Sequence, residues 1–399
     1  MPELPDLPSG RRHRVLHVAH QCLPHIGGLE TVVAAETRGL AGRGWDVALV
    51  SSADTVAPGV SREDGIRTVR VRAWNGLEPH GVPFPVFSPW LLVVLWREIR
   101  RADVVHVHDL LYLSSWIAAL CCVLLRTPYV LHRHVGFVHH SSAFGRLVQR
   151  VVIHTIGRLM VRHAALVLPI DDHVAADLRS SFPGARIEVL GNGVDTTAFR
   201  PMSEEERLAQ RGVLGLPADR PLVLFVGRFV PKKGFQHLVA AASDDYDVVL
   251  VGGPPPPGVD DPRLHFLGGR PAAEMPAVYG CADVMVVASV GECPLTVLES
   301  MSTGLPLVAN DDPALRSPWT AGPGVDFVDV ASGDLQQALE QLVSDRDVVR
   351  RRGAEARAYV QASFSWDAHV DRLERVYERV LDAARETAVP RSEIPKHLS

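Results

Sequence analysis

Short apolar runs alternate with longer amphipathic runs along most of the chain, and this alternation limits the fold more than any other feature. In the first half, an amphipathic run with helical spacing covers 30–42, and strands are predicted at the apolar runs 15–19, 47–51, 104–107, 129–131, 166–169 and 187–190. Continuous apolar runs of this length are typical of parallel strands that are buried on both faces. The pattern therefore predicts βαβ units and a doubly wound sheet.

The same alternation restarts after residue 200. Strands are predicted at 222–226, 247–251, 264–266, 284–287 and 307–309, and helices at 234–242, 272–279, 294–302 and 335–343. A connector over 199–216 contains Pro201 and a charged run, and an amphipathic helix follows over 366–385. The chain is therefore expected to be an α/β protein with two similar halves.

The length of 399 residues fits about two domains. We expect an N-terminal domain over 13–198, a C-terminal domain over 199–365 and a final helical segment over 366–386. The ends of the chain carry Pro and charged residues, with Gly near the start and Ser in the tail, so disorder is expected over 1–12 and 387–399.

Composition excludes several classes of protein. The net charge of -5 offers no overall basic surface, so nucleic acid is not an expected partner. The five cysteines form no CxxC pair and are expected to be buried residues of a cytoplasmic protein. The start of the chain lacks the apolar core of a signal peptide. The most apolar stretch, 110–125, is too short to span a membrane and is expected to be a buried helix.

Two glycine-containing turns follow predicted strands. Gly27 and Gly28 allow a ligand to approach the backbone just before a helix, whose free N–H groups suit phosphate, although a simple tight turn explains them equally well. The second turn, 227–234, places Arg228 and Lys233 at the carboxyl end of a strand, where open α/β sheets bind ligands. This second turn favours anion binding over a solvated basic turn.

A third motif covers 289–301 and opens a predicted helix with two carboxylates, Glu292 and Glu299. Glu299 lies among apolar residues of that helix and needs a polar partner. A ribose diol is one such partner, and a neighbouring arginine is the alternative.

Several histidines lie near two of the predicted strands, namely His106, His108, His132, His134, His139 and His140. Their spacing resembles a metal site, but a zinc site is expected to include Cys or carboxylate ligands that the sequence does not show beside them. No metal site is predicted; one histidine at a strand end is expected to work with a substrate hydroxyl instead.

Together and in this order, these segments resemble the retaining glycosyltransferases of family 4. That family has the GT-B fold, in which two Rossmann-like domains face each other across a cleft. The resemblance covers roughly residues 14–385 and rests on 27–30, 105–109, 128–134, 191–195, 227–228, 233–234, 279–283, 289, 299, 304–306 and 364–366.

The resemblance implies roles for the matched residues. Arg228 and Lys233 should hold the donor diphosphate, and Glu299 should bind the nucleotide ribose. His134 should contact the transferred sugar near the reaction centre. The helix over 366–386 should cross back to the N-terminal domain.

Further donor contacts are implied at three places. Gly27 and Gly28 should lie against phosphate or acceptor, and the backbone near Gly269 and Arg270 should meet the base. The remaining donor-binding residues are Glu292, Cys293, Pro294 and Leu295.

The sequence departs from the family pattern at one of these positions. The family has seven residues between its two glutamates, whereas six separate Glu292 from Glu299, so the first family position falls on Gly291. Either Glu292 still reaches the sugar from a shorter loop, which we favour, or backbone N–H groups make that contact.

The implied reaction moves a hexose-type sugar from an NDP-sugar, with UDP preferred and GDP next, to a hydroxyl of a bacterial glycan, lipid-linked or small-molecule acceptor. The anomeric configuration is retained, and no cofactor or essential metal is expected. The alternatives are a non-catalytic NDP-sugar-binding subunit and another NDP-sugar-processing enzyme, such as an epimerase. A substitution at Glu292 or His134 should abolish turnover only if the protein is an enzyme.

The segment 144–163 interleaves arginines with apolar residues. Such a helix can lie on an anionic membrane, which would suit a lipid-linked acceptor, or can simply cover the protein core. Another apolar stretch, 90–96, can line an acceptor pocket or pack internally. The expected location is the cytoplasm, with peripheral contact at the inner membrane face as an option.

Overall fold

The computed structural model describes residues 13–25, 27–53, 56–74, 76, 85–134 and 150–388. The disorder predicted for 1–12 and 389–399 lies outside these residues, as do His139 and His140. Within the described ranges, no helix combines the length and apolar character needed to cross a membrane. The chain divides into an N-terminal unit, Met1–Ile170, Val174–Leu190 and Val370–Ser399, and a C-terminal unit, Asp171–His173 and Gly191–His369.

The N-terminal unit is built on one sheet with the order β3-β4-β2-β1-β6-β7-β8. Its strands are β1 (Arg14–Val18), β2 (Asp46–Ala53), β3 (Gly59–Glu63), β4 (Ile66–Trp74), β5 (Val86–Phe87), β6 (Val104–His108), β7 (Tyr129–Arg133) and β8 (Leu166–Pro169). All pairs are parallel except β3 and β5, which pair antiparallel with β4.

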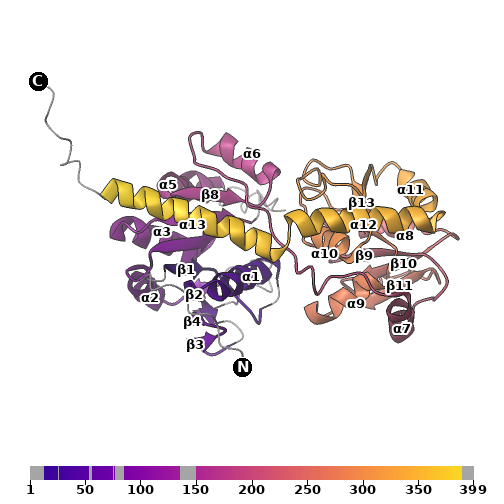
Figure 1. The fold of residues 1–399 in the computed structure, drawn as a ribbon, viewed down its shortest axis with the longest axis horizontal. Coiled ribbons are helices and arrows are strands. Elements are labelled where there is room, and N and C mark those ends of the chain that lie inside the picture. The colour runs from indigo at the N-terminus through magenta and orange to yellow at the C-terminus, as the bar shows by residue number, and fades with distance from the viewer. Residues whose placement is uncertain are drawn as a thin grey trace, which may run out of the picture. The chain divides into compact units, whose positions relative to one another are not determined.

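Helices cover both faces of this sheet (Figure 1). They are α1 (Gly28–Gly42), α2 (Trp90–Ile99), α3 (Leu113–Leu125), a π-helical turn (Ile153–Gly157) continued by α5 (Arg158–His163), α6 (Asp172–Ser181) and α13 (Trp366–Ala388). The alternation along β1 explains the two layers, because Val15 packs into one apolar cluster with α1 and α13, whereas Leu16 packs into another with α2 and α3.

The C-terminal unit has an all-parallel sheet with the order β11-β10-β9-β12-β13-β14. The strands are β9 (Leu222–Val226), β10 (Asp247–Val251), β11 (Leu264–Gly268), β12 (Val284–Val287), β13 (Leu307–Asn310) and β14 (Val325–Val328). The helices are α7 (Glu204–Leu214), a 3-10 turn (Pro231–Lys233), α8 (Phe235–Ala240), a second 3-10 turn (Ala272–Glu274), α9 (Met275–Gly280), α10 (Thr296–Thr303), α11 (Asp334–Val343) and α12 (Arg346–Ser363).

Both units have the strand order of a Rossmann fold. Counted by their parallel strands, each follows the order 3-2-1-4-5-6, and the N-terminal unit adds antiparallel strands at its β4 edge. The prediction of two Rossmann-like domains is therefore confirmed. The cysteine prediction is also confirmed, because all five cysteines are free and buried.

Several local predictions were wrong. Residues 187–190 run beside β8 and hydrogen-bond to the Val167 and Pro169 carbonyls, but they form only one isolated bridge, at Ile187 beside Val167, and no regular strand. The apolar stretch 110–125 contains α3, but that helix exposes Leu120 and Leu124 instead of being fully buried. The final helix extends to Ala388, two residues into the predicted tail.

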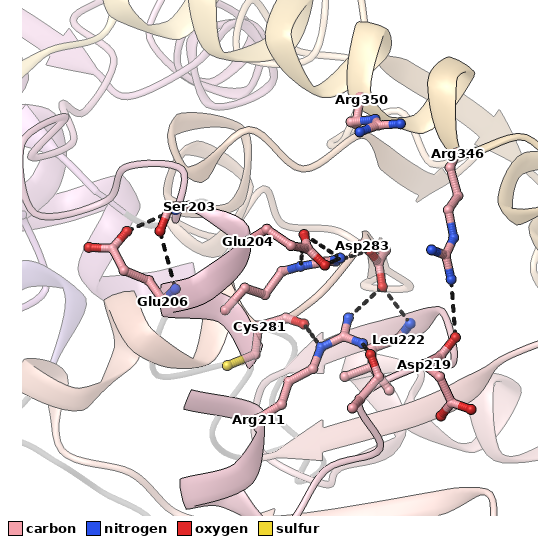
Figure 2. A network of polar contacts seen from close by, with 12 residues as sticks. Ser203, Glu204, Glu206, Arg211, Asp219, Leu222, Cys281, Asp283, Arg346 and Arg350 are labelled. Atoms are coloured by element: carbon pink, nitrogen blue, oxygen red, sulfur yellow. Dashed lines mark hydrogen bonds and ion pairs between the residues drawn. The ribbon is translucent and has the colours of Figure 1, made fainter. Parts of the chain in front are cut away.

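A polar network fastens α7 to the amino ends of β9 and β12 (Figure 2). The buried Arg211 guanidinium donates to Asp283 Oδ2 at 2.7 Å and to the Cys281 carbonyl at 2.9 Å. Asp283 Oδ2 also accepts from the Leu222 N–H at 2.8 Å. This network therefore lies at the end of the sheet opposite the carboxyl ends of the strands.

Candidate active site

In each unit, the strand order reverses beside the first parallel strand. The reversal lies between β9 and β12 in the C-terminal unit and between β1 and β6 in the N-terminal unit. Loops that leave the carboxyl ends of such strands diverge and leave room for a ligand. The loops after these four strands are therefore where a site is expected, and they carry most of the predicted residues.

In the C-terminal unit, a glycine brings the loops after β9 and β12 into contact. Gly234 has φ +73°, and a Cβ at this position would lie 2.3 Å from the Ala288 carbonyl oxygen. Only glycine tolerates both the left-handed backbone and this approach. The basic loop after β9 is therefore held directly against the end of β12.

Lys232, Lys233 and Glu292 form the charged centre of this contact. Lys233 Nζ pairs with Glu292 Oε1, and Lys232 Nζ lies 2.6 Å from Glu292 Oε2. Burial raises the pKa of Glu292, but the two lysines outweigh burial and hold its pKa below the ordinary value. Glu292 is therefore an anion, and it forms ion pairs with the lysines that a phosphate group would otherwise bind.

Arg228 lies on the same loop, one residue after Gly227, and its side chain is exposed. It forms no ion pair within the described part of the chain. An exposed guanidinium near two lysines is suited to binding a phosphorylated ligand. The structure thus places Arg228, Lys233 and Glu292 around two adjoining loops, in agreement with their predicted grouping.

Glu299 lies on α10, one turn into the helix. Its Oε2 accepts a hydrogen bond of 2.6 Å from the hydroxyl of Tyr279, which is fully buried. Burial raises the pKa of Glu299 more than this hydrogen bond lowers it. The alternative of an arginine partner is not what the structure has: a tyrosine bonds one carboxylate oxygen, and the second oxygen can accept from a hydroxyl group.

Other predicted donor residues differ in how they can act. Cys293 is buried, and its Sγ lies 3.6 Å from Ser317 Oγ, so only its backbone can reach a ligand. Pro294 and Leu295 are half-buried and precede the first turn of α10.

Gly269 and Arg270 follow β11, at the edge of the sheet. The Arg270 side chain bonds the Leu267 carbonyl at 3.0 Å and Glu274 at 3.2 Å. Among the described residues, no hydrogen bond or ion pair joins this loop to the Lys233–Glu292 pair. The sheet therefore separates these two residues from the charged centre by the width of β10.

Sequence analysis missed Asp312, which supports the loop after β12. Its Oδ1 accepts from the Gly291 N–H at 3.2 Å and from the Ala314 N–H at 2.8 Å. The signal was the acidic run Asp311-Asp312 directly after the predicted strand 307–309 and Asn310. A carboxylate here holds the shortened loop that carries Glu292.

In the N-terminal unit, Gly27 and Gly28 begin α1. A Cβ on Gly27 would lie 2.2 Å from Glu30 Oε2, so a larger residue would displace this buried carboxylate. Glu30 Oε1 lies 3.3 Å from His25 Nδ1. The amino end of α1 thus already carries a carboxylate, and burial raises its pKa.

His134 follows β7, and its position is set by neighbouring strand ends. A buried ion pair between Asp109 and Arg133 joins the ends of β6 and β7. His134 Nε2 lies 3.1 Å from Nδ1 of His108, the last residue of β6. His134 is half-buried, so one side of its ring can meet a ligand of the N-terminal unit.

Apart from Gly269 and Arg270, the predicted residues therefore lie in two groups, one at the strand ends of each unit. The C-terminal group combines three cations and two carboxylates, which suit the phosphates and hydroxyls of a nucleotide. The N-terminal group combines a glycine turn with a histidine, which can exchange a proton with a hydroxyl.

Comparisons with known proteins agree with this arrangement. Residues 26–198 match the family model Glycosyltransferase Family 4, and residues 220–345 match Glycosyl transferases group 1. A D-inositol 3-phosphate glycosyltransferase of Nocardia farcinica is 28% identical, over 89% of this chain and 85% of its own length. The protein of that name from Mycolicibacterium smegmatis is also 28% identical, over 95% and 94%.

Solved structures of low sequence identity share the fold. A sucrose-phosphate synthase from Thermosynechococcus elongatus has a TM-score of 0.73 at 22% identity, covering 93% of this chain and 100% of its own. The Anabaena protein HepE, solved in complex with UDP, has a TM-score of 0.70 at 17% identity, covering 92% and 100%. The predicted family and enzyme class are confirmed: this chain belongs to glycosyltransferase family 4 and is a glycosyltransferase.

Proposed function

We propose that this enzyme transfers a hexose-type sugar from a UDP-sugar, with a GDP-sugar as the second candidate, to an acceptor hydroxyl with retention at the anomeric carbon. The main support is the Lys232–Lys233–Glu292 centre beside Arg228 at the strand reversal of the C-terminal unit. The UDP complex of the structural neighbour HepE supports the choice of base.

Lys233 and Arg228 stabilise the negative charge that grows on the leaving diphosphate. These cations balance the negative charge without a metal ion at the phosphates, and no cofactor is needed for the transfer. The leaving phosphate accepts the proton of the acceptor hydroxyl, so no enzyme nucleophile is required. Glu292 contacts the sugar from its shortened loop, Glu299 binds the ribose, and His134 lies near the transferred sugar.

The acceptor is a sugar-like molecule from a bacterium, either part of a glycan, lipid-linked or small. The relatives named D-inositol 3-phosphate glycosyltransferase favour a small phosphorylated polyol. A pocket of the N-terminal unit supports this choice, because Arg133, Arg150 and His154 are among its lining residues.

We further propose that the protein works in the cytoplasm and contacts the inner membrane peripherally. Of the predicted segment 144–163, residues 150–163 are described, and they expose Arg150, Arg158 and Arg162 beside Val151 and Leu159. The helix α2 adds exposed apolar side chains to the same unit, namely Trp90, Leu92, Val93 and Trp96. Arginines near apolar side chains favour anionic lipid surfaces.

A donor screen tests the main proposal. Purified protein is melted with UDP-, GDP-, ADP- and dTDP-sugars, and slow sugar hydrolysis is followed in parallel. We expect stabilisation by the UDP series, its loss in Lys233→Ala and its retention in Lys232→Ala, whose lysine is more exposed. If no nucleotide sugar stabilises the protein, the catalytic proposal is wrong and the non-catalytic subunit is favoured. Conversion of the donor without release of nucleotide would favour the epimerase.

A vesicle assay tests the membrane proposal separately. Sedimentation with phosphatidylglycerol vesicles should retain the wild type and lose the double variant Trp90→Ser, Trp96→Ser. Equal sedimentation of both proteins, or equal binding to neutral vesicles, would contradict this role for the exposed surface.

A further inference from the structure

Five strongly polar side chains lie together in the interior of the N-terminal unit, where apolar side chains are usual. We call them the histidine cluster: His17, Glu36, His106, His108 and His132. All five are completely buried. Buried titratable side chains at this density are uncommon in a protein core and require a specific explanation.

The sheet register explains how the histidines meet. His17 on β1 pairs with His106 on β6, and His108 on β6 pairs with His132 on β7. Since side chains two residues apart share a face, all four histidines project from one face of three adjacent strands. Glu36 approaches them from α1.

The distances within the cluster match the ligand shell of one metal ion. His17 Nδ1 lies 3.0 Å from His108 Nε2, and Glu36 Oε2 lies 3.7 Å from His17 Nδ1 and 3.8 Å from His108 Nε2. The last two distances are too long for hydrogen bonds. The ligand atoms of a tetrahedral zinc site lie about 2.0–2.2 Å from the metal and therefore about 3.3–3.6 Å from one another. The three distances in the cluster lie on either side of this range.

A fourth ligand is close to this set. One ligand atom each from His17, Glu36, His106 and His108 can be chosen within 4.8 Å of one another. His106 Nδ1 lies 2.5 Å from the Tyr377 hydroxyl. Among the described residues, His106 Nε2 is buried with no hydrogen-bond partner. Tyr377 therefore orients this ring, as second partners of metal-bound histidines do.

The ligand chemistry also favours a metal ion. Imidazole nitrogens together with one carboxylate oxygen are a common ligand set for Zn²⁺ in proteins.

We propose that the histidine cluster binds one Zn²⁺-like divalent ion through His17 Nδ1, His108 Nε2 and Glu36 Oε2, with His106 at the fourth position. Sequence analysis set a metal site aside because no carboxylate accompanied the histidines. Glu36 supplies that carboxylate from a helix 70 residues before His106.

The site would also orient His134. If His108 Nε2 binds the metal, His108 Nδ1 carries the proton and donates it to His134 Nε2 across 3.1 Å. This fixes which nitrogen of His134 is protonated. The effect of this His134 proton on sugar transfer rests on the proposed function, whereas the proposal that the cluster binds a metal ion does not.

The first test measures metal content without any glycosyl transfer. The full chain is produced with a histidine-free affinity tag, stripped with a chelator, loaded with Zn²⁺ or Co²⁺ and desalted. We expect about one ion per chain by elemental analysis, visible Co²⁺ bands typical of four-coordinate sites, and a higher melting temperature for the loaded protein. Less than one tenth of an ion per chain, or an unchanged melting temperature, would overturn the proposal.

Two variants locate the bound ion. Glu36→Gln and His17→Gln should lose the ion and the thermal shift, whereas His265→Gln should keep both. His265 is a suitable control because it pairs with a carboxylate, Asp247, at 2.7 Å outside the cluster. If the cluster variants keep as much metal as the control, the ion binds elsewhere and the assignment is wrong. If they fail to fold, the Co²⁺ spectrum of the wild type decides, since bands of a six-coordinate oxygen site would refute histidine ligation.

Discussion

Replacing Glu292 with glutamine removes one charge from the centre of the proposed donor site and hardly changes its size. The carboxylate binds both Lys232 and Lys233 in the structure. Because the donor diphosphate is proposed to bind Lys233, the carboxylate and the diphosphate compete for the same cation. We expect Glu292→Gln to bind UDP more tightly and to transfer sugar more slowly.

The magnitude follows from the exposure of the three side chains. Lys232 is 56% exposed, so its pair with Glu292 is worth at most about 1 kcal/mol. Lys233 is 19% and Glu292 29% exposed, and a hydrogen bond between partly buried charges contributes about 1.5 kcal/mol or somewhat more. Glu292→Gln should therefore lose about 2 kcal/mol of unfolding free energy at pH 7. Releasing Lys233 should tighten UDP binding about tenfold, which corresponds to ~1.4 kcal/mol.

The pH dependence provides an internal check. The folded protein holds the pKa of Glu292 below its ordinary value. The pair therefore stabilises the fold above the unfolded pKa of about 4.3, and this stability is lost as pH falls through the lower folded pKa. The difference between wild type and Glu292→Gln should be full at pH 7 and should shrink below about pH 4.

Urea unfolding and calorimetric titration measure these effects. Asp347→Asn is the matched control, because its pair with Arg350 is largely exposed and should change stability by less than about 0.5 kcal/mol. Unchanged or weaker UDP binding by Glu292→Gln would refute the competition for Lys233. Loss of affinity for UDP-sugar relative to UDP would favour the contact between Glu292 and the sugar.

Three further substitutions test other contacts. Tyr279→Phe removes the 2.6 Å donor to Glu299, so the pKa of Glu299 should rise further and UDP affinity, measured by calorimetry, should fall about tenfold. Arg211→Met removes one partner of Asp283 of Figure 2, which keeps its ion pair with Arg207, and should cost about 1–3 kcal/mol in urea unfolding; a loss under about 0.5 kcal/mol would contradict this. Gly234→Ala adds a methyl group 2.3 Å from a carbonyl oxygen at φ +73°, so about 1–3 kcal/mol of stability and most donor binding should be lost, as thermal melts with UDP would show.

The core strands were predictable because each is a continuous apolar run buried on both faces. The predicted bounds of β8, β9, β10 and β12 agree with the structure at both ends. The strands β3 and β4 were missed because neither is a continuous apolar run. All five residues of β3 are exposed, and in β4 the buried Val69 and Val71 alternate with the less buried Arg70 and Arg72. Such strands lack the continuous pattern on which the prediction relied.

Two of the missed helices, α7 and α12, were missed for different reasons. The predicted connector contains α7, which begins with a capping box formed by Ser203 and Glu206. This signal was present in the sequence but was interpreted as a charged linker. The helix α12 buries only Gly353, Ala356 and Val360, so its packing face consists of small residues that hydrophobic periodicity does not detect.

The candidate donor site could be predicted where its chemistry is local. Arg228 and Lys233 follow a strand within eight residues, and position after a parallel strand suffices to suggest a ligand. The partner of each charge was not predictable, because Glu292 is 59 residues from Lys233 and Tyr279 is 20 residues from Glu299. These pairs depend on strand order and on the packing of α9 against α10, which no single segment encodes.

The histidine cluster shows how strongly such long-range placement controls the interpretation of a motif. Spacing alone places His106 and His108 on one face of a strand, because side chains alternate. It does not say which strand lies beside them or that α1 turns Glu36 toward that face. Without Glu36, the four imidazoles form a buried polar patch with no carboxylate ligand. With Glu36, the same imidazoles surround a buried carboxylate, and a bound divalent cation would balance its charge.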